Sequence, residues 1–217
     1  MRRLVVAGLL LAAIGLTPSV ASASPDDTVN FHFTGRAGSA VLTDCPPPPS
    51  PIGTECRAVS VFAAEQRVND DGVRAGGPFV AVTLFDVIIT GGAPGFVAIP
   101  IGDGFTDKAS VQVTGMAKGT ASAVDVPLCE TFSCAPGDPR SLSVRVDWRG
   151  FGPVSESVFH DRRDGECFFY FHHTGRVRSA DAVGTVDGAT WTVPLAAGFI
   201  PTLEANTDGS VQRCTPG

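Results

Sequence analysis

The stretch Ser141-Leu142-Ser143-Val144-Arg145-Val146-Asp147-Trp148 gives the clearest indication of the fold class, because apolar and polar residues alternate strictly along it. Successive side chains of an extended chain point to opposite sides, so this pattern predicts a β-strand with one buried face and one polar face. Beyond residue 23, apolar residues at helical spacing over a dozen positions are hard to find. We therefore predict an all-β protein.

Outward from this stretch, short alternating runs recur between glycines, prolines and Asp-Gly pairs. Asp-Gly tolerates the left-handed backbone of tight hairpin turns, and the segment 186–189 is the best predicted hairpin. The other Asp-Gly turns are expected at 71–72, 103–104, 164–165 and 208–209. The patterns predict strands at 29–33, 57–63, 79–89, 110–114, 120–126, 141–148, 155–160, 167–173, 177–186, 190–193 and 210–214.

The number of short strands also restricts the architecture. An antiparallel sheet with one apolar face must pack against a second sheet or close on itself. We predict a single all-β domain over residues 24–217, built as an antiparallel β-sandwich, with a β-barrel as the alternative. Disulfides are expected to cross-link its loops.

The first 23 residues have the pattern of a secretory signal peptide. Arg2 and Arg3 precede an apolar run over 4–16, and Ala21-Ser22-Ala23 offers small residues for cleavage. The apolar run is shorter than the roughly 20 residues that a membrane-spanning helix needs, and no second run follows. We therefore expect residues 1–23 to be cleaved and the protein to be secreted to the extracellular space, without spanning a membrane.

Six cysteines lie beyond residue 23, an even number that predicts three disulfides in an oxidising compartment. Spacing favours local pairing, because two of the possible pairs bracket only ten and four residues. Cysteine thiolates and the four histidines, His32, His160, His172 and His173, could form a zinc site. The chain has no C-x2-C pair and no second pair at zinc-finger distance, so we predict no metal site and no cofactor. The expected disulfides are Cys45–Cys56, Cys129–Cys134 and Cys167–Cys214.

Two segments of the chain resemble each other. Residues 31–40 and 171–180 share seven identities in ten positions at an offset of 140. One interpretation is a duplicated half-domain or two equivalent sites. The other, which we favour, is coincidence in a chain rich in small residues, or a bend that both segments adopt between strands.

The segment 167–173 is the strongest candidate for a binding surface. Its alternation places aromatic residues or histidines on both faces of a strand, whereas the core of a sandwich covers only one face. Arginines lie close by, and aromatic side chains beside guanidinium groups are typical of protein interfaces and of sugar or polyanion sites. The alternative is a central strand buried under a loop. The candidate binding residues are Arg145, Tyr170, His172, Arg176 and Arg178.

No motif indicates catalysis. The chain lacks G-x-S-x-G, S-x-x-K and H-E-x-x-H, and its net charge of -6 excludes an overall basic nucleic-acid footprint. We expect a secreted, non-catalytic binding or structural module whose partner is an extracellular glycan or protein. The alternatives are a secreted hydrolase, which requires His160 or His172 beside a carboxylate and a serine, and a protease inhibitor acting through the loop 129–134.

Overall fold

The computed structural model describes residues 28–47, 49–70, 73–91, 95–129, 140–163, 169–193 and 200–214. These residues form ten β-strands, and all the pairings between them are antiparallel. The prediction of an all-β antiparallel fold is confirmed. The strands are β1 (Thr28–Thr43), β2 (Glu55–Asp70), β3 (Val73–Ile89), β4 (Phe96–Thr106), β5 (Ala109–Thr114), β6 (Lys118–Cys129), β7 (Ser141–Arg163), β8 (Phe169–Val186), β9 (Ala189–Thr192) and β10 (Thr202–Cys214).

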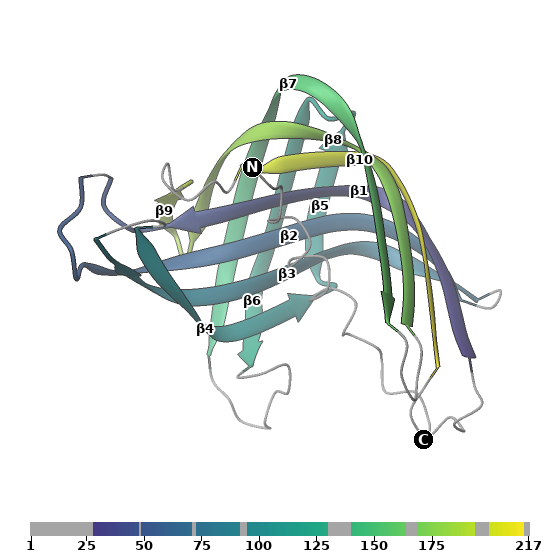
Figure 1. Cartoon of the computed structure of the whole chain (residues 1–217), viewed down its shortest axis with the longest axis horizontal. Helices are drawn as coiled ribbons and strands as arrows, with labels where there is room; N and C mark the ends of the chain where they lie inside the picture. Colours follow the sequence, from purple (N-terminus) through teal and green to yellow (C-terminus); the bar gives the residue numbers. More distant parts are fainter. Residues whose placement is uncertain are drawn as a thin grey trace.

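Strand pairing joins all ten strands into one sheet (Figure 1). The path runs β10-β1-β2-β3-β4-β6-β7-β8, and β8 pairs back with β10, so these strands form a closed ring. β5 is attached to β6, and β9 is attached to β8 and meets β1 at one position. The pairings therefore do not divide the strands into the two separate sheets of a sandwich. The described residues include no helix that could cross a membrane.

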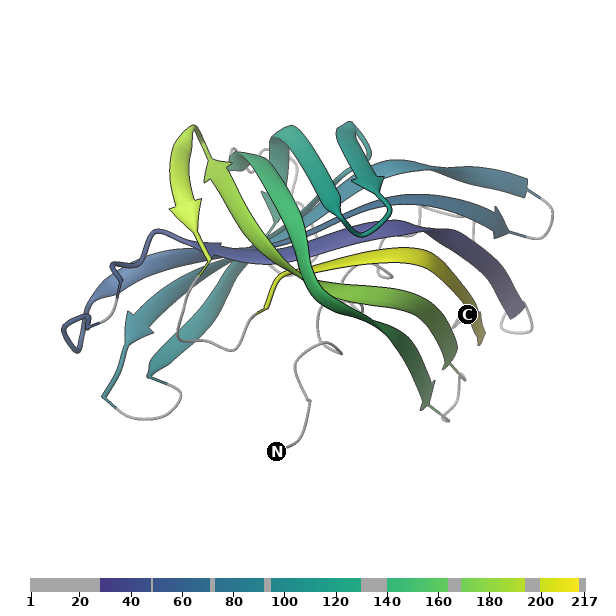
Figure 2. The ribbon, with the colours of Figure 1, turned by 90° about the horizontal axis from the view of Figure 1, so that it is seen from above.

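Several strands are longer than their predicted counterparts, and they bend along their length (Figure 2). The predicted strands 141–148 and 155–160 are both part of β7, with a register shift between Gly150 and Val154. The predicted strands 167–173 and 177–186 are likewise combined in β8. The glycines and proline near 150–153 suggest a turn from local composition, but a bulge can bend a strand without ending it.

Two of the predicted Asp-Gly turns are wrong, because both pairs lie inside strands. Asp103 and Gly104 belong to β4, which the sequence patterns missed, and Asp208 and Gly209 belong to β10. Asp103 Oδ1 accepts a hydrogen bond from Thr83 Oγ1 at 2.6 Å, so its side chain links β4 to β3. The pairs 71–72 and 164–165 lie outside the described residues.

The predicted hairpin at Asp187-Gly188 is confirmed. It joins β8 to β9, and the two residues have φ angles of 49° and 81°, as a type I′ turn requires. Asp187 Oδ1 also accepts a hydrogen bond from the backbone N–H of Ser143 at 2.7 Å, which ties the turn to β7.

The main core lies between the central strands β1–β3 and the strands β5–β9 behind them (Figure 1). The apolar positions of the stretch 141–148 are all buried in it, as predicted. Trp148 is 3% exposed, and its indole Nε1 donates a hydrogen bond to the backbone carbonyl of Ser39 at 2.9 Å. Trp148 thus packs between the central strands and the strands behind them, and its indole N–H has a hydrogen-bond acceptor.

A smaller apolar cluster lies on the opposite face of the central strands. Phe62 is its largest member, and Phe79 packs beside it with ring centroids 5.9 Å apart. Phe105 extends the row, 5.4 Å from Phe79. The central strands therefore bury apolar side chains on both faces.

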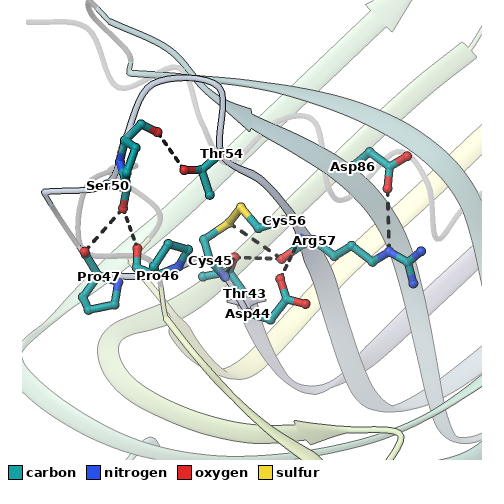
Figure 3. Close-up of a disulfide and its surroundings, with 11 residues drawn as sticks. Thr43, Asp44, Cys45, Pro46, Pro47, Ser50, Thr54, Cys56, Arg57 and Asp86 are labelled. Atoms are coloured by element: carbon teal, nitrogen blue, oxygen red, sulfur yellow. Dashed lines mark hydrogen bonds and ion pairs between the residues drawn. A yellow bond between two sulfur atoms is a disulfide. The ribbon is translucent and has the colours of Figure 1, made fainter.

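The disulfide Cys45–Cys56 is confirmed and connects the end of β1 to the start of β2 (Figure 3). Around it, Asp44 Oδ1 accepts a hydrogen bond from the backbone N–H of Arg57 at 2.7 Å, and Thr43 Oγ1 donates one to the carbonyl of Arg57 at 2.7 Å. Cys129 is also disulfide-bonded. Its predicted partner Cys134 lies outside the described residues, as does Cys167, the predicted partner of Cys214, so these two pairings stay predictions.

Candidate functional site

Five long strands present a polar surface beyond the main core. Along β8, Ala180 and Ala182 are buried in the core, whereas the alternate positions nearer its start carry Arg178, Arg176 and His172. These residues share one face of the strand, because side chains alternate along it. We call this surface the polar face; its described side chains are His32, Thr34, Arg36, Glu65, Arg67, Asn69, Val154, Glu156, Val158, His160, Arg162, His172, Thr174, Arg176, Arg178, Asp208 and Ser210.

Strand register places five of these residues in one line across the sheet. Asn69 pairs with His32, His32 with Ser210, Ser210 with His172, and His172 with His160. Directly opposed residues of antiparallel strands point to the same face, so this histidine row crosses β2, β1, β10, β8 and β7. It brings together residues from four distant parts of the sequence.

His160 and His172 are in direct contact within the histidine row. Their Nδ1 atoms are 3.0 Å apart, and their ring centroids are 4.4 Å apart with the planes tilted by 38°. A hydrogen bond between two Nδ1 atoms needs a proton on one and a lone pair on the other. The two imidazoles therefore share one proton at this contact.

The two similar segments flank β10 in matching register. β10 residue Ser210 pairs with His32 on one side and with His172 on the other, and Asp208 pairs with Thr34 and Thr174. Residues that are 140 positions apart in the two segments therefore occupy equivalent positions on the two sides of β10. Both pairings shift register just beyond these residues, where β10 has one extra residue relative to β1 and to β8.

The charged groups of the polar face differ in their contacts. Arg36 Nη1 donates a hydrogen bond to the carbonyl of Val113, and Arg178 Nε donates one to the carbonyl of Gly152, both at 2.9 Å. Arg67 and Arg176 are exposed and make no ion pair or side-chain hydrogen bond to any described residue. Among the described residues, these two guanidinium groups therefore have no partner that a ligand would have to displace.

The structure brings together three of the five predicted binding residues: His172, Arg176 and Arg178 lie on the polar face. Tyr170 belongs to the same strand, opposite Arg162, and its side chain lies outside the described residues.

Arg145 is not part of this group. It lies in the half of β7 that covers the main core, opposite Thr185 of β8, and alternates with the buried Val144 and Val146. It therefore points away from the core on the other side of β7, where its Nε is 3.4 Å from Asp147 Oδ2.

The opposite face of the same strands buries a titratable pair that the sequence analysis missed. His173 is 2% exposed and Glu204 is 8% exposed, and the distance from His173 Nε2 to Glu204 Oε2 is 3.8 Å. Burial raises the pKa of Glu204 to about 7. Burial also lowers the pKa of His173, and His172 adds to this effect while Asp208 opposes it. No local sequence pattern marks Glu204 as buried, because it lies in a run of alternating apolar and polar residues like others in the chain.

The geometry that a hydrolase would need is not found among the described residues. His160 and His172 contact each other there, and neither has a carboxylate or serine hydroxyl as a hydrogen-bond partner. The one described group of three clustered metal-ligand types is Asp44, Cys45 and Cys56, but both sulfur atoms are in the disulfide (Figure 3). The proposed inhibitor loop 129–134 lies outside the described residues except for Cys129.

No protein-family model matches the chain, and no curated protein and no solved structure matches it either.

Proposed function

We propose that this protein is a secreted, non-catalytic binding module whose polar face binds an extracellular anionic glycan. The observation that carries the proposal is the matched placement of two similar segments on either side of β10, with exposed cationic side chains beside them. Secretion is supported by the signal-peptide pattern of residues 1–23 and by the disulfide, which suits an oxidising compartment.

The chemistry of the polar face favours an anionic ligand. Its described arginines outnumber its carboxylates, although the whole chain has a net charge of -6. Arg67 and Arg176 have no protein partner among the described residues, so their guanidinium groups can form bidentate hydrogen bonds to carboxylate or sulfate groups without breaking an ion pair.

The geometry favours a ligand with a repeating structure. The segments 31–40 and 171–180 are separated by one strand, which places equivalent residues about 9.6 Å apart, at two inter-strand spacings. A polymer crossing the strands would meet a similar set of groups twice. Two weak contacts on one chain raise the overall affinity without any new kind of contact.

The test is binding of the full, oxidised chain to a panel of acidic and neutral polysaccharides, measured by co-sedimentation. We expect binding to acidic polysaccharides, weakened by salt because exposed charges are screened. The double variant R67A/R176A should lose most of this binding and keep its melting temperature, since both side chains are exposed.

The matched control is R145A, which removes an exposed arginine outside the polar face. It should bind acidic polysaccharides like the wild type. Equal binding by R67A/R176A and the wild type would overturn the proposed surface. A protein that bound none of the acidic polysaccharides would overturn the anionic-glycan proposal and favour a protein partner or a structural role.

A further inference from the structure

We propose that His160 and His172 form a binding site for a divalent late transition metal, with Cu²⁺ as the preferred ion. The site consists of the two Nδ1 atoms that face each other across β7 and β8. Both histidines lie on the polar face, but the site uses neither Arg67 nor Arg176, so variants can test the two proposals separately. It also differs from the expectation of no metal site, which rested on cysteine spacing.

The separation of the two nitrogen atoms fits chelation of a single ion. Imidazole nitrogens bind metals at about 2.0–2.1 Å, so two nitrogens on one ion lie about 2.9 Å apart at a right angle and about 3.3 Å apart at the tetrahedral angle. The observed separation of 3.0 Å is close to the right-angle value. Tetragonal nitrogen and oxygen sites are typical of Cu²⁺ and Ni²⁺, whereas Zn²⁺ prefers a tetrahedral arrangement. Cu²⁺ also binds most strongly among these ions.

The backbone holds the two histidines in place before any ion binds. They are directly opposed in a stretch of β7–β8 pairing that runs without a register shift from Val154↔Arg178 to Arg163↔Phe169. His160 is exposed and His172 is half-buried, so an ion can reach the pair from solvent. Replacement of the shared proton by a metal ion requires no movement of the strands.

The protein supplies two ligands to this site. Among the described residues, no third His, Cys, Asp or Glu forms a cluster with this pair at metal-binding distance. His32 is the next histidine of the row, but Ser210 lies between it and His172. Water or an exogenous oxygen ligand would therefore complete the coordination sphere. No sequence motif marks this site, because the pairing of two strands brings the histidines together.

The experiment titrates the full, oxidised chain with CuCl2 and measures affinity by calorimetry. We expect one Cu²⁺ per chain above the background of an H160A/H172A variant. Each single variant, H160A or H172A, should weaken binding about 100-fold or more, because the second tethered ligand acts at high effective concentration. The matched control H32A removes an exposed histidine of the same row and should leave the affinity unchanged. Affinity should fall at acidic pH, since protons compete for the ligand nitrogens.

Electron paramagnetic resonance of the wild-type Cu²⁺ complex gives a direct second readout. We expect a tetragonal spectrum with coupling to two imidazoles, and coupling to one imidazole in H172A. The proposal is overturned if H160A/H172A binds Cu²⁺ as tightly as the wild type, or if H32A weakens binding as much as H172A does. Unchanged Cu²⁺ binding by a protein that binds no acidic polysaccharide would separate this site from the proposed glycan surface.

Discussion

Glu204→Gln is expected to change the pH dependence of stability. Glu204 is 8% exposed, and burial raises its pKa from 4.5 to about 7. The folded protein therefore retains a proton that the unfolded chain releases between pH 4.5 and pH 7. Its contribution to stability is complete below pH 4.5 and is lost as the pH rises to 7. Glutamine is nearly isosteric and cannot ionise, so the variant avoids this loss.

The magnitude follows from the pKa shift. One pKa unit corresponds to 1.36 kcal/mol, so the shift from 4.5 to about 7 makes the wild type lose about 3 kcal/mol of unfolding free energy across this range. The E204Q variant should gain this amount relative to the wild type between pH 4.5 and pH 7.5. The lowered pKa of His173 acts in the opposite direction, since its contribution to stability falls as the pH drops below 6.5. His173 is present in both proteins, so taking the difference largely removes its effect.

The assay is urea unfolding of both proteins at half-unit pH steps, with the disulfides intact. The control is Glu156→Gln, which replaces an exposed carboxylate of β7, leaves the buried pair intact and should not reproduce the gain of about 3 kcal/mol. A constant difference between E204Q and the wild type, or one that shrinks with rising pH, would refute the reasoning. Glu204 would then be ionised in the folded protein and stabilised by a charged His173.

Further substitutions test the packing of the fold, each by urea unfolding. Replacing both Cys45 and Cys56 with alanine should cost about 3 kcal/mol, because the disulfide spans 11 residues and restricts the unfolded chain; an unchanged midpoint would contradict this. Gly35→Ala should cost about 2 kcal/mol or more, since a Cβ there would overlap the carbonyl of Glu65. Gly175→Ala, at the equivalent position, should change stability by less than about 1 kcal/mol, because the nearest atom is 3.4 Å away; equal effects would contradict the packing argument. Trp148→Phe should cost about 2 kcal/mol, because it removes the indole hydrogen bond and leaves part of a buried site unfilled, and a neutral effect would contradict this.

Features set by interactions between near neighbours could be read from the sequence. Alternation at 141–148 predicted a strand and its buried face, because side-chain direction depends only on the extended backbone. Asp187-Gly188 predicted a hairpin, because its positive φ angles suit these two residues. The disulfide Cys45–Cys56 could be predicted for a related reason: a short intervening segment makes the loop easy to close.

Local composition predicted turns wrongly where pairing with distant strands outweighs the turn preference. The segment 150–153 has the composition of a turn, yet β7 continues through it because β8 pairs with it on both sides of the bulge. Asp103-Gly104 resembles a hairpin turn, but Gly104 faces Leu128 of β6, where a Cβ would collide with neighbouring atoms. Hydrogen bonding to neighbouring strands outweighs a turn preference of about 1 kcal/mol at such positions.

The candidate sites depended on register between distant strands, which no local pattern contains. His160 meets His172 because β7 and β8 are opposed in one register, and a shift of one residue would turn both side chains to the other face. The same holds for the two similar segments, whose common position relative to β10 follows from the closing of the ring. Burial of Glu204 likewise comes from packing around neighbouring strands. The alternating pattern fixes which residues can share a face, and the packing of the whole chain selects which of them meet.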